Sequence, residues 1–187
     1  MDAKNGRRII LASASPRRKE LLAFLIPKFD IVPSTVIESS HGTPSFQVVT
    51  LASNKAAQIA SLYPNALVIG ADTLVFLGSK PLGKPENETD ARRMLRLLSG
   101  RTHRVLTGVC VICGNKRRAK AALTRVRFAE LTDDEISAYI DTGEPMDKAG
   151  AYGIQGQFSK HIKEIHGCYH NVMGLPLNLL YNMLKSL

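Results

Sequence analysis

The chain has 187 residues, of which 44% are hydrophobic and 22% charged, a composition typical of a soluble globular protein. No apolar run is long enough to span a bilayer, which excludes a membrane protein. Residues 1–8 are polar and lack the apolar stretch of a signal peptide. We therefore expect a cytoplasmic protein in which residues 1–8 form a flexible N-terminal segment.

The formal charge of +9 would suit a nucleic acid, a membrane surface or a small polyanion as partner. The basic residues are scattered, Trp is absent and aromatic residues make up only 6% of the chain, a poor supply for base stacking. The three cysteines are too few for a disulfide framework. Cys110 and Cys113 form a CxxC within an apolar strand pattern, where they face opposite sides, so we favour packing over zinc or redox use.

Strand and helix patterns alternate along the chain. Ser15-Pro16 is typical of a helix start, and Thr132 with Glu135 forms a capping box. Gly114-Asn115 joins two apolar segments as a hairpin, which argues against a purely parallel sheet. The sequence therefore predicts an α/β fold, a mixed twisted sheet with flanking helices. We expect strands at residues 8–12, 29–32, 67–77, 104–113, 118–130 and 161–165, helices at 15–26, 44–63, 87–98, 132–142 and 176–184, and loops at 37–43 and 147–156.

Asp72 is an acid between two apolar runs, residues 66–71 and 73–77, that are typical of buried strand. An ionised carboxylate in that setting is costly unless a cation, a metal or a hydrogen-bond donor meets it. Lys55 lies within the apolar stripe of the helix at residues 44–63. Its side chain either extends to solvent or meets an anion inside a cleft.

The turn after the first strand carries Ser13, Ser15, Arg17 and Arg18. Hydroxyls and backbone N–H groups at a helix start favour phosphate, and arginine binds it with a fork of donors. The alternative is an N-cap followed by surface arginines. The turn lacks the glycines and lysine of a P-loop, which excludes a Walker-type site.

Three further polar residues, Glu38, Lys84 and Gln155, carry little information alone. Gln155 stands between glycines that let the backbone approach a ligand closely. The whole set suits a polyphosphate with a magnesium-type ion, which takes few carboxylates besides phosphate oxygens. Its members are four cations, Arg17, Arg18, Lys55 and Lys84, and two acids, Glu38 and Asp72.

The chain resembles the Maf family of nucleoside triphosphate pyrophosphatases from Ile10 to about Leu184. Several specific motifs occur in the family's order. They are residues 11–18 (LASASPRR), 51–56 (LASNKA), 70–73 (GADT), 83–85 (GKP), 98–100 (LSG), 147–156 (DKAGAYGIQG) and 172–177 (VMGLPL).

The resemblance implies one elongated, two-lobed domain over residues 1–187 around a central cleft, as in inosine triphosphatase-like proteins. It implies hydrolysis between the α and β phosphates with Mg, Mn or Co, in a cytoplasmic homodimer. Asp72 matches the general base, and Glu38 with Asp72 matches the metal site. The phosphate-binding set is matched by Ser13, Ser15, Arg17, Arg18, Lys55 and Lys84.

Arg17, Thr73 and Gln155 agree with the branch of the family that prefers dTTP and UTP. The branch acting on 7-methyl-GTP carries Trp, Gln and Glu at those positions. Some members also act on modified pyrimidine nucleotides. One departure is Gln157-Phe158 after Gly156, where many relatives have a glycine.

Two other functions are compatible with parts of the sequence. The first is a nucleic-acid-binding regulator of cell division; the basic charge and the family's link to septation support it, whereas the scattered charge opposes it. The second is a nucleotide sensor without turnover. Asp72 opposes the sensor, because binding alone needs no buried base.

Overall fold

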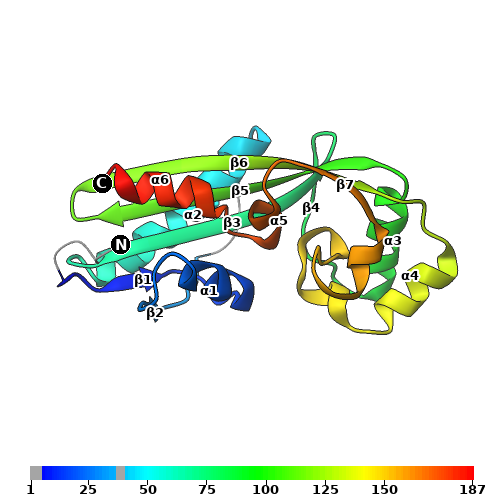
Figure 1. Ribbon diagram of the computed structural model, residues 1–187, viewed down its shortest axis with the longest axis horizontal. Coiled ribbons are helices and arrows are strands. Elements are labelled where there is room, and N and C mark those ends of the chain that lie inside the picture. Colours follow the sequence, from blue (N-terminus) through cyan, green and yellow to red (C-terminus); the bar gives the residue numbers. More distant parts are fainter. Residues whose placement is uncertain (1–5, 37–40) are drawn as a thin grey trace. The chain divides into compact units, whose positions relative to one another are not determined.

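The computed structural model describes residues 6–36 and 41–187. A seven-stranded sheet with the order β2-β1-β3-β5-β6-β7, and β4 paired to β3, forms the framework (Figure 1). The strands are β1 (Ile9–Leu11), β2 (Asp30–Ile31), β3 (Leu67–Leu77), β4 (Lys80–Leu82), β5 (Thr102–Cys113), β6 (Lys116–Phe128) and β7 (Ile162–His166). The α-helices are α1 (Pro16–Ala23), α2 (Pro44–Leu62), α3 (Glu88–Leu98), α4 (Asp133–Ile140), α5 (Tyr169–Met173) and α6 (Leu177–Lys185).

The sheet is mixed, which confirms the predicted α/β class. β1 pairs in parallel with β2 and with β3, whereas β3–β4 and β6–β7 are antiparallel. β5 and β6 are neighbours on either side of Gly114-Asn115, where Gly114 has a φ of 58°. The predicted hairpin turn is therefore present, with a glycine where a left-handed backbone is required.

Contacts divide the chain into two compact units. Unit 1 comprises residues 1–72, 107–122 and 174–187, and unit 2 comprises residues 73–106 and 123–173. β3, β5 and β6 each contribute residues to both units. The single domain around a cleft that the family resemblance implies stays a prediction.

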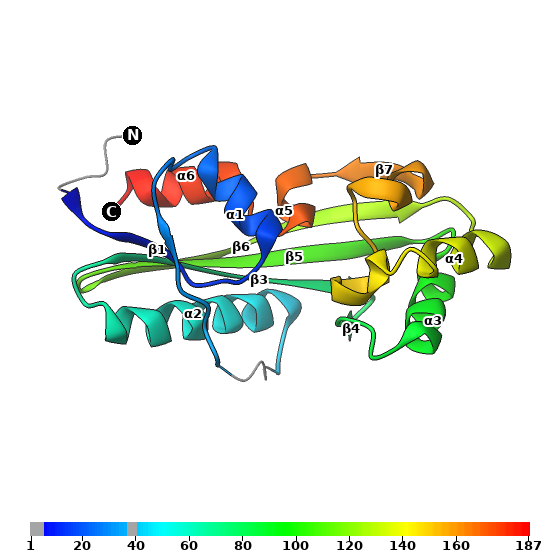
Figure 2. The same cartoon turned by 90° about the horizontal axis from the view of Figure 1, so that it is seen from below.

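In unit 1, α2 covers one face of the sheet, and α1 and α6 cover the other (Figure 2). Ser15 caps α1 as predicted, because its Oγ accepts from the N–H of Arg18 at 3.4 Å, and Pro16 follows it. Thr43 caps α2 in the same way. Small residues on α2, Ala52 and Ala56, pack against the strands. Among residues 6–36 and 41–187, no helix is both long and apolar enough to cross a bilayer.

Unit 2 is built around packed helices and a cluster of rings. α3 contacts α4, and the predicted capping box of Thr132 and Glu135 is present at the start of α4. Phe158 is 1% exposed and lies within 4.7–5.5 Å, between ring centroids, of its neighbours. Those neighbours are Phe128, Tyr139, Tyr152 and His161.

The sequence prediction differs from the structure in short elements. β4 and α5 were not expected, and α1 ends at Ala23, so Leu25 and Ile26 follow the helix that was expected to include them. The segment at residues 147–156, predicted as loop, contains the single-turn helix η3 (Ala149–Ala151) and the ends of η2 (Glu144–Asp147) and η4 (Gly156–His161). Such elements have too few residues for a period to be recognised.

Protonation of His103 is expected to destabilise the protein in mildly acidic solution. The side chain is 1% exposed, and burial lowers its pKa from 6.5 to about 4. Between those values the unfolded chain binds a proton that the folded chain does not. The free energy of unfolding is therefore highest, as far as His103 is concerned, above pH 6.5. Between pH 6.5 and pH 4 the protonation of His103 in the unfolded chain lowers this free energy by about 3 kcal/mol.

The unfolding free energy in urea at pH 7 and at pH 4 measures this effect. His103→Gln should show a smaller drop between the two pH values than the wild type does. His166→Gln, at an exposed position of β7, serves as the control and should behave like the wild type. An equal drop in all three proteins would rule out His103 as the source.

Candidate functional site

A buried ion pair joins α2 to β3 in unit 1. The Nζ of Lys55 lies 2.5 Å from Oδ1 of Asp72, and the two residues are 8% and 4% exposed. The side chain of Lys55 could extend to solvent or meet an anion, and the structure shows that it meets an anion, the carboxylate of Asp72. Asp72 meets a cation, as its apolar setting required.

Two glycines bring the backbone of α2 against the sheet beside this pair. A Cβ built on Gly70 of β3 would lie 2.4 Å from the carbonyl oxygen of Ala52, and one on Gly108 of β5 would lie 2.0 Å from that of Val48. Real Cβ atoms essentially never come so close to another atom. The absence of side chains at Gly70 and Gly108 therefore sets the distance at which Lys55 meets Asp72.

The turn after β1 is a hydrogen-bonded unit. The Oγ of Ser13 accepts from the Nη1 of Arg18 at 3.0 Å and from the N–H of Ser15 at 3.3 Å. The Nε of Arg18 donates to the carbonyl oxygen of Gly174 at 2.9 Å. Three predicted phosphate-binding residues, Ser13, Ser15 and Arg18, are thus held together, and Arg17 follows Pro16 in the first turn of α1, half-buried.

The Ser13–Arg18 turn follows the carboxyl end of β1, and Asp72 lies within the neighbouring strand β3. Leu11 of β1 is paired with Ile69 of β3 in a parallel register, and the N–H of Ala12 donates to the carbonyl oxygen of Ile69 at 2.8 Å. Ser13 is two residues beyond Leu11, and Asp72 is three beyond Ile69. In open α/β sheets, ligands bind beyond the carboxyl ends of parallel strands. The position therefore suits a binding site.

The remaining predicted residues, Thr73, Lys84 and Gln155, belong to unit 2. Lys84 is exposed, and Thr73 and Gln155 are half-buried. The carbonyl oxygen of Gly83 accepts from the N–H of Gly150 at 2.9 Å. This bond ties the turn that carries Lys84 to the segment that leads to Gln155. Glu38, a predicted metal ligand, lies outside the described residues.

Net charge is concentrated in unit 1. Its residues include 13 Lys and Arg against 5 Asp and Glu, a net charge of +8, whereas unit 2 has 12 against 11, or +1. The excess of cations therefore belongs to the unit that contains the Ser13–Arg18 turn and Lys55. This distribution favours an anionic ligand at that part of the chain.

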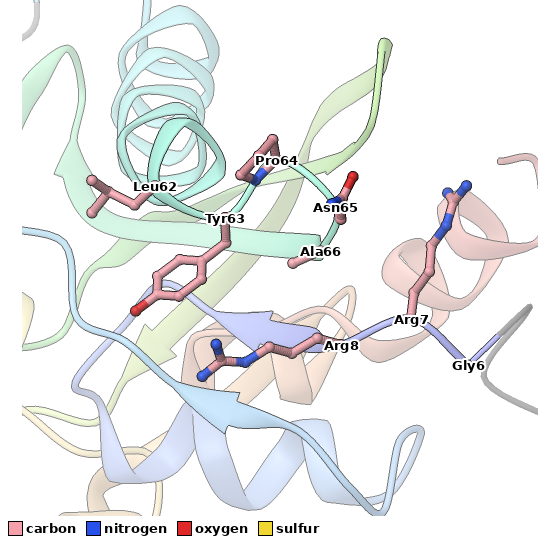
Figure 3. A pocket seen from close by; sticks show the side chains of 8 residues that line it. All are labelled: Gly6, Arg7, Arg8, Leu62, Tyr63, Pro64, Asn65 and Ala66. Atoms are coloured by element: carbon pink, nitrogen blue, oxygen red, sulfur yellow. The ribbon is translucent and has the colours of Figure 1, made fainter.

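A shallow hollow of about 430 Å³ lies elsewhere in unit 1 (Figure 3). Arg8 stands at its edge, with its guanidinium 4.7 Å from the centroid of the Tyr63 ring and its Nε 2.5 Å from Oδ2 of Asp30. The hollow contains none of the predicted site residues and is not the candidate site. Its lining consists of Gly6, Arg7, Arg8, Leu62, Tyr63, Pro64, Asn65 and Ala66.

The CxxC pair occupies two environments. Cys110 is fully buried, and burial raises the pKa of its thiol, so the thiolate is disfavoured. The Sγ of Cys113 instead accepts from the Nη1 of Arg7 at 2.7 Å. Both are free cysteines. These surroundings agree with a packing role for Cys110.

Sequence reasoning missed residues that position the site. Gly70 and Gly108 are isolated glycines within strand patterns, a signal that often marks the close approach of another backbone. Glu144, which contacts the segment carrying Gln155, had no signal in the sequence, because it is one acid among several near α4.

The fold is that of a mixed α/β protein with a buried Lys–Asp pair between α2 and β3. A family model described as Maf-like protein matches residues 8–187. A protein of Thermococcus gammatolerans named dTTP/UTP pyrophosphatase is 50% identical over 94% of this chain and 94% of its own length. Proteins of the same name from Koribacter versatilis and Bacillus cereus are each 49% identical over 96% of this chain, and over 94% and 95% of their own lengths. The chain belongs to the Maf family.

Proposed function

We propose that this protein is a nucleoside triphosphate pyrophosphatase that hydrolyses dTTP and UTP to the monophosphate and pyrophosphate. The buried pair of Lys55 and Asp72, formed on the strand β3 that neighbours β1 and its Ser13–Arg18 turn, is the observation that carries the proposal. The name of its relatives at about 50% identity supports the same reaction. An aqueous triphosphate is anionic, and this part of the chain has the cations to receive it.

Arginine, lysine and serine side chains together bind the triphosphate in this proposal. Arg17 and Arg18 offer planar forks of donors suited to phosphate oxygens, and Ser13 and Ser15 offer hydroxyls. Lys55 and Lys84 contribute compact charges. The Ser13–Arg18 hydrogen bond at 3.0 Å preorganises one fork before the ligand binds.

Asp72 is the general base in this proposal. Its carboxylate accepts a proton from the attacking water while the phosphoanhydride bond between the α and β phosphates breaks. Lys55, at 2.5 Å, holds one carboxylate oxygen in place in the free protein. A phosphate oxygen then offers Lys55 a second anion, which weakens its hold on Asp72 and leaves the carboxylate a better proton acceptor.

A divalent ion, Mg, Mn or Co, fits these residues as a companion of the substrate. No cluster of three His, Cys, Asp or Glu side chains suited to a metal is present within residues 6–36 and 41–187. Magnesium-type ions are commonly held by one or two carboxylates together with phosphate oxygens, a requirement that Asp72 and Glu38 meet by type. When bound, the ion would neutralise phosphate charge and polarise the bond to be broken.

The preference for pyrimidine nucleotides rests on Arg17, Thr73 and Gln155. The amide of Gln155 can both donate to and accept from a base edge, which suits the alternating groups of uracil and thymine. The departure at Gln157-Phe158 does not alter that amide. Phe158 is buried among the rings of unit 2, and the N–H of Gln157 donates to Glu144 at 3.3 Å. Modified pyrimidine triphosphates are therefore candidate substrates as well.

A panel of natural and modified nucleoside triphosphates with Mg, Mn and Co tests the proposal, with pyrophosphate release as the readout. We expect dTTP and UTP to be turned over fastest, and a chelator to abolish the reaction. Binding without turnover would favour the sensor. Steeply salt-dependent binding to DNA, with no hydrolysis, would favour the nucleic-acid regulator.

We also infer a cytoplasmic homodimer. The family resemblance, which implies a cytoplasmic homodimer, supports this inference. Light scattering coupled to size exclusion would give twice the chain mass for a dimer; a mass of 20.5 kDa would contradict it.

A further inference from the structure

The segment that carries Gln155 has an unusual backbone. Gly150, Ala151 and Gly156 have φ values of 72°, 59° and 78°, and Ala151 is the one residue other than glycine with a positive φ in the described parts of the chain. Such a conformation is strained for alanine and persists only where neighbouring groups hold it. Groups that hold this segment therefore set where the Gln155 amide points.

The carboxylate of Glu144 lies against both sides of Gln155. Its Oε2 accepts from the N–H of Gln157 at 3.3 Å. A Cβ built on Gly153 would lie 2.8 Å from Oε1, and one on Gly156 would lie 2.9 Å from it. The two glycines thus leave the space that the carboxylate occupies.

Tyr139 connects the same carboxylate to the other flank. The Tyr139 hydroxyl accepts from the N–H of Gly153 at 3.1 Å and donates to Oε1 of Glu144 at 3.3 Å. Burial, and to a smaller extent Glu144, raise the pKa of Tyr139, so the hydroxyl keeps its proton. The carboxylate of Glu144 therefore holds both flanks of Gln155. It holds Gly153 through Tyr139, and it holds Gln157 directly.

The backbone of Glu144 is itself fixed. Its N–H donates to Oγ1 of Thr142 at 3.1 Å, and its carbonyl oxygen accepts from the Nζ of Lys148 at 2.5 Å. Lys148 also pairs with Asp147 at 2.7 Å. Glu144 is thus anchored independently of the segment that its side chain holds.

We propose that Glu144 is a positioning residue for Gln155 and that it contributes to the discrimination of uracil from other bases. This inference rests on the proposed pyrophosphatase function. Glu144 need not touch the substrate. Its carboxylate holds Gly153 and Gln157 at fixed positions, and the amide between them keeps one orientation toward the base.

The ratio of kcat/KM for UTP to that for CTP tests this role, because the two nucleotides differ only at the base edge. Glu144→Ala should lower the ratio about tenfold, the value of one ordinary hydrogen bond. Gln155→Ala should lower it at least as much. The double variant should then be no less selective than Gln155→Ala, because both changes remove the same recognition.

Hydrogen exchange gives a readout that does not depend on activity. The amides of residues 153–157 should exchange faster in Glu144→Ala than in the wild type. Glu144→Gln keeps an acceptor for the N–H of Gln157 and should lose less selectivity. Tyr139→Phe keeps the ring and removes the hydroxyl that links Glu144 to Gly153, so it tests the role if Glu144→Ala does not fold. Glu164→Ala, at an exposed position of β7, is the control and should leave the ratio unchanged.

Two outcomes would overturn the inference. An unchanged ratio in Glu144→Ala would show that the residue does not act on selectivity, and equal losses with UTP and CTP would be the form of that result that shows a merely structural role. Additive losses in the double variant would show that Glu144 acts by a route other than Gln155. A wild type that hydrolyses no triphosphate would instead overturn the proposed function itself, so the two failures are distinguishable.

Discussion

Asp72→Asn is expected to lower the turnover of UTP by about a thousandfold. The amide has nearly the same shape as the carboxylate but cannot accept the proton of the attacking water, and positioned bases commonly contribute 10²–10⁴-fold to a rate. In the wild type the Nζ of Lys55 lies 2.5 Å from the Asp72 carboxylate. The amide oxygen of asparagine can still accept a hydrogen bond from Lys55. The variant should therefore fold and bind the nucleotide while losing turnover.

The same variant should also lose some stability. Removing one charge of a buried pair leaves the other charge uncompensated, and complete loss of a partner costs about 3–5 kcal/mol. Because asparagine keeps one hydrogen bond to Lys55, we expect a loss of about 1–3 kcal/mol in the unfolding free energy. Asp141→Asn, at an exposed position, is the matched control and should change neither quantity. Full activity of Asp72→Asn would exclude Asp72 as the base.

Gly108→Ala is expected to destabilise unit 1 strongly. The new methyl group would lie 2.0 Å from the carbonyl oxygen of Val48 and 2.7 Å from the nitrogen of Val49. Both atoms belong to the backbone of α2, so the clash is relieved only by moving the helix. Overpacking of a core costs about 1–3 kcal/mol and occasionally more, and this contact lies at the upper end.

Activity should fall with stability in this variant, because α2 also carries Lys55. Gly70→Ala places a methyl group 2.4 Å from the carbonyl oxygen of Ala52, one turn before Lys55. This variant should lose stability and activity as Gly108→Ala does. Gly83→Ala is the control for stability, since a Cβ there has no atom within 4 Å. Urea unfolding of the three variants measures the effect. Equal stability of Gly108→Ala and Gly83→Ala would contradict the close approach of α2 to the sheet.

The sequence predicted the long elements and the buried acid well. β3 has the predicted bounds, and α2 ends one residue before the predicted boundary, because long apolar patterns and the Thr43-Pro44 start are strong local signals. The buried setting of Asp72 predicts a cation, a metal or a hydrogen-bond donor as its partner, and the apolar stripe of α2 predicts that Lys55 either extends to solvent or meets an anion. Periodicity and the cost of a buried charge thus narrow the partners of each residue, and the structure shows that the two residues pair with each other.

Other parts of the site depend on contacts between distant residues. The register that joins Leu11 to Ile69, and so aligns the Ser13–Arg18 turn with Asp72, arises from strand pairing across more than fifty residues of chain. The approach of α2 to Gly108 and the hold of Glu144 on the Gln155 segment are also tertiary. Local propensity contains none of this information.

The products of UTP hydrolysis test the central claim most directly. With UTP, magnesium and the purified protein, ³¹P NMR should show UMP and pyrophosphate appearing in equal amounts and no UDP. Asp72→Asn at the same concentration should leave the UTP signals almost unchanged over the same time. Formation of UDP and phosphate, absence of turnover in the wild type, or undiminished turnover in Asp72→Asn would contradict a pyrophosphatase that uses this carboxylate as its base.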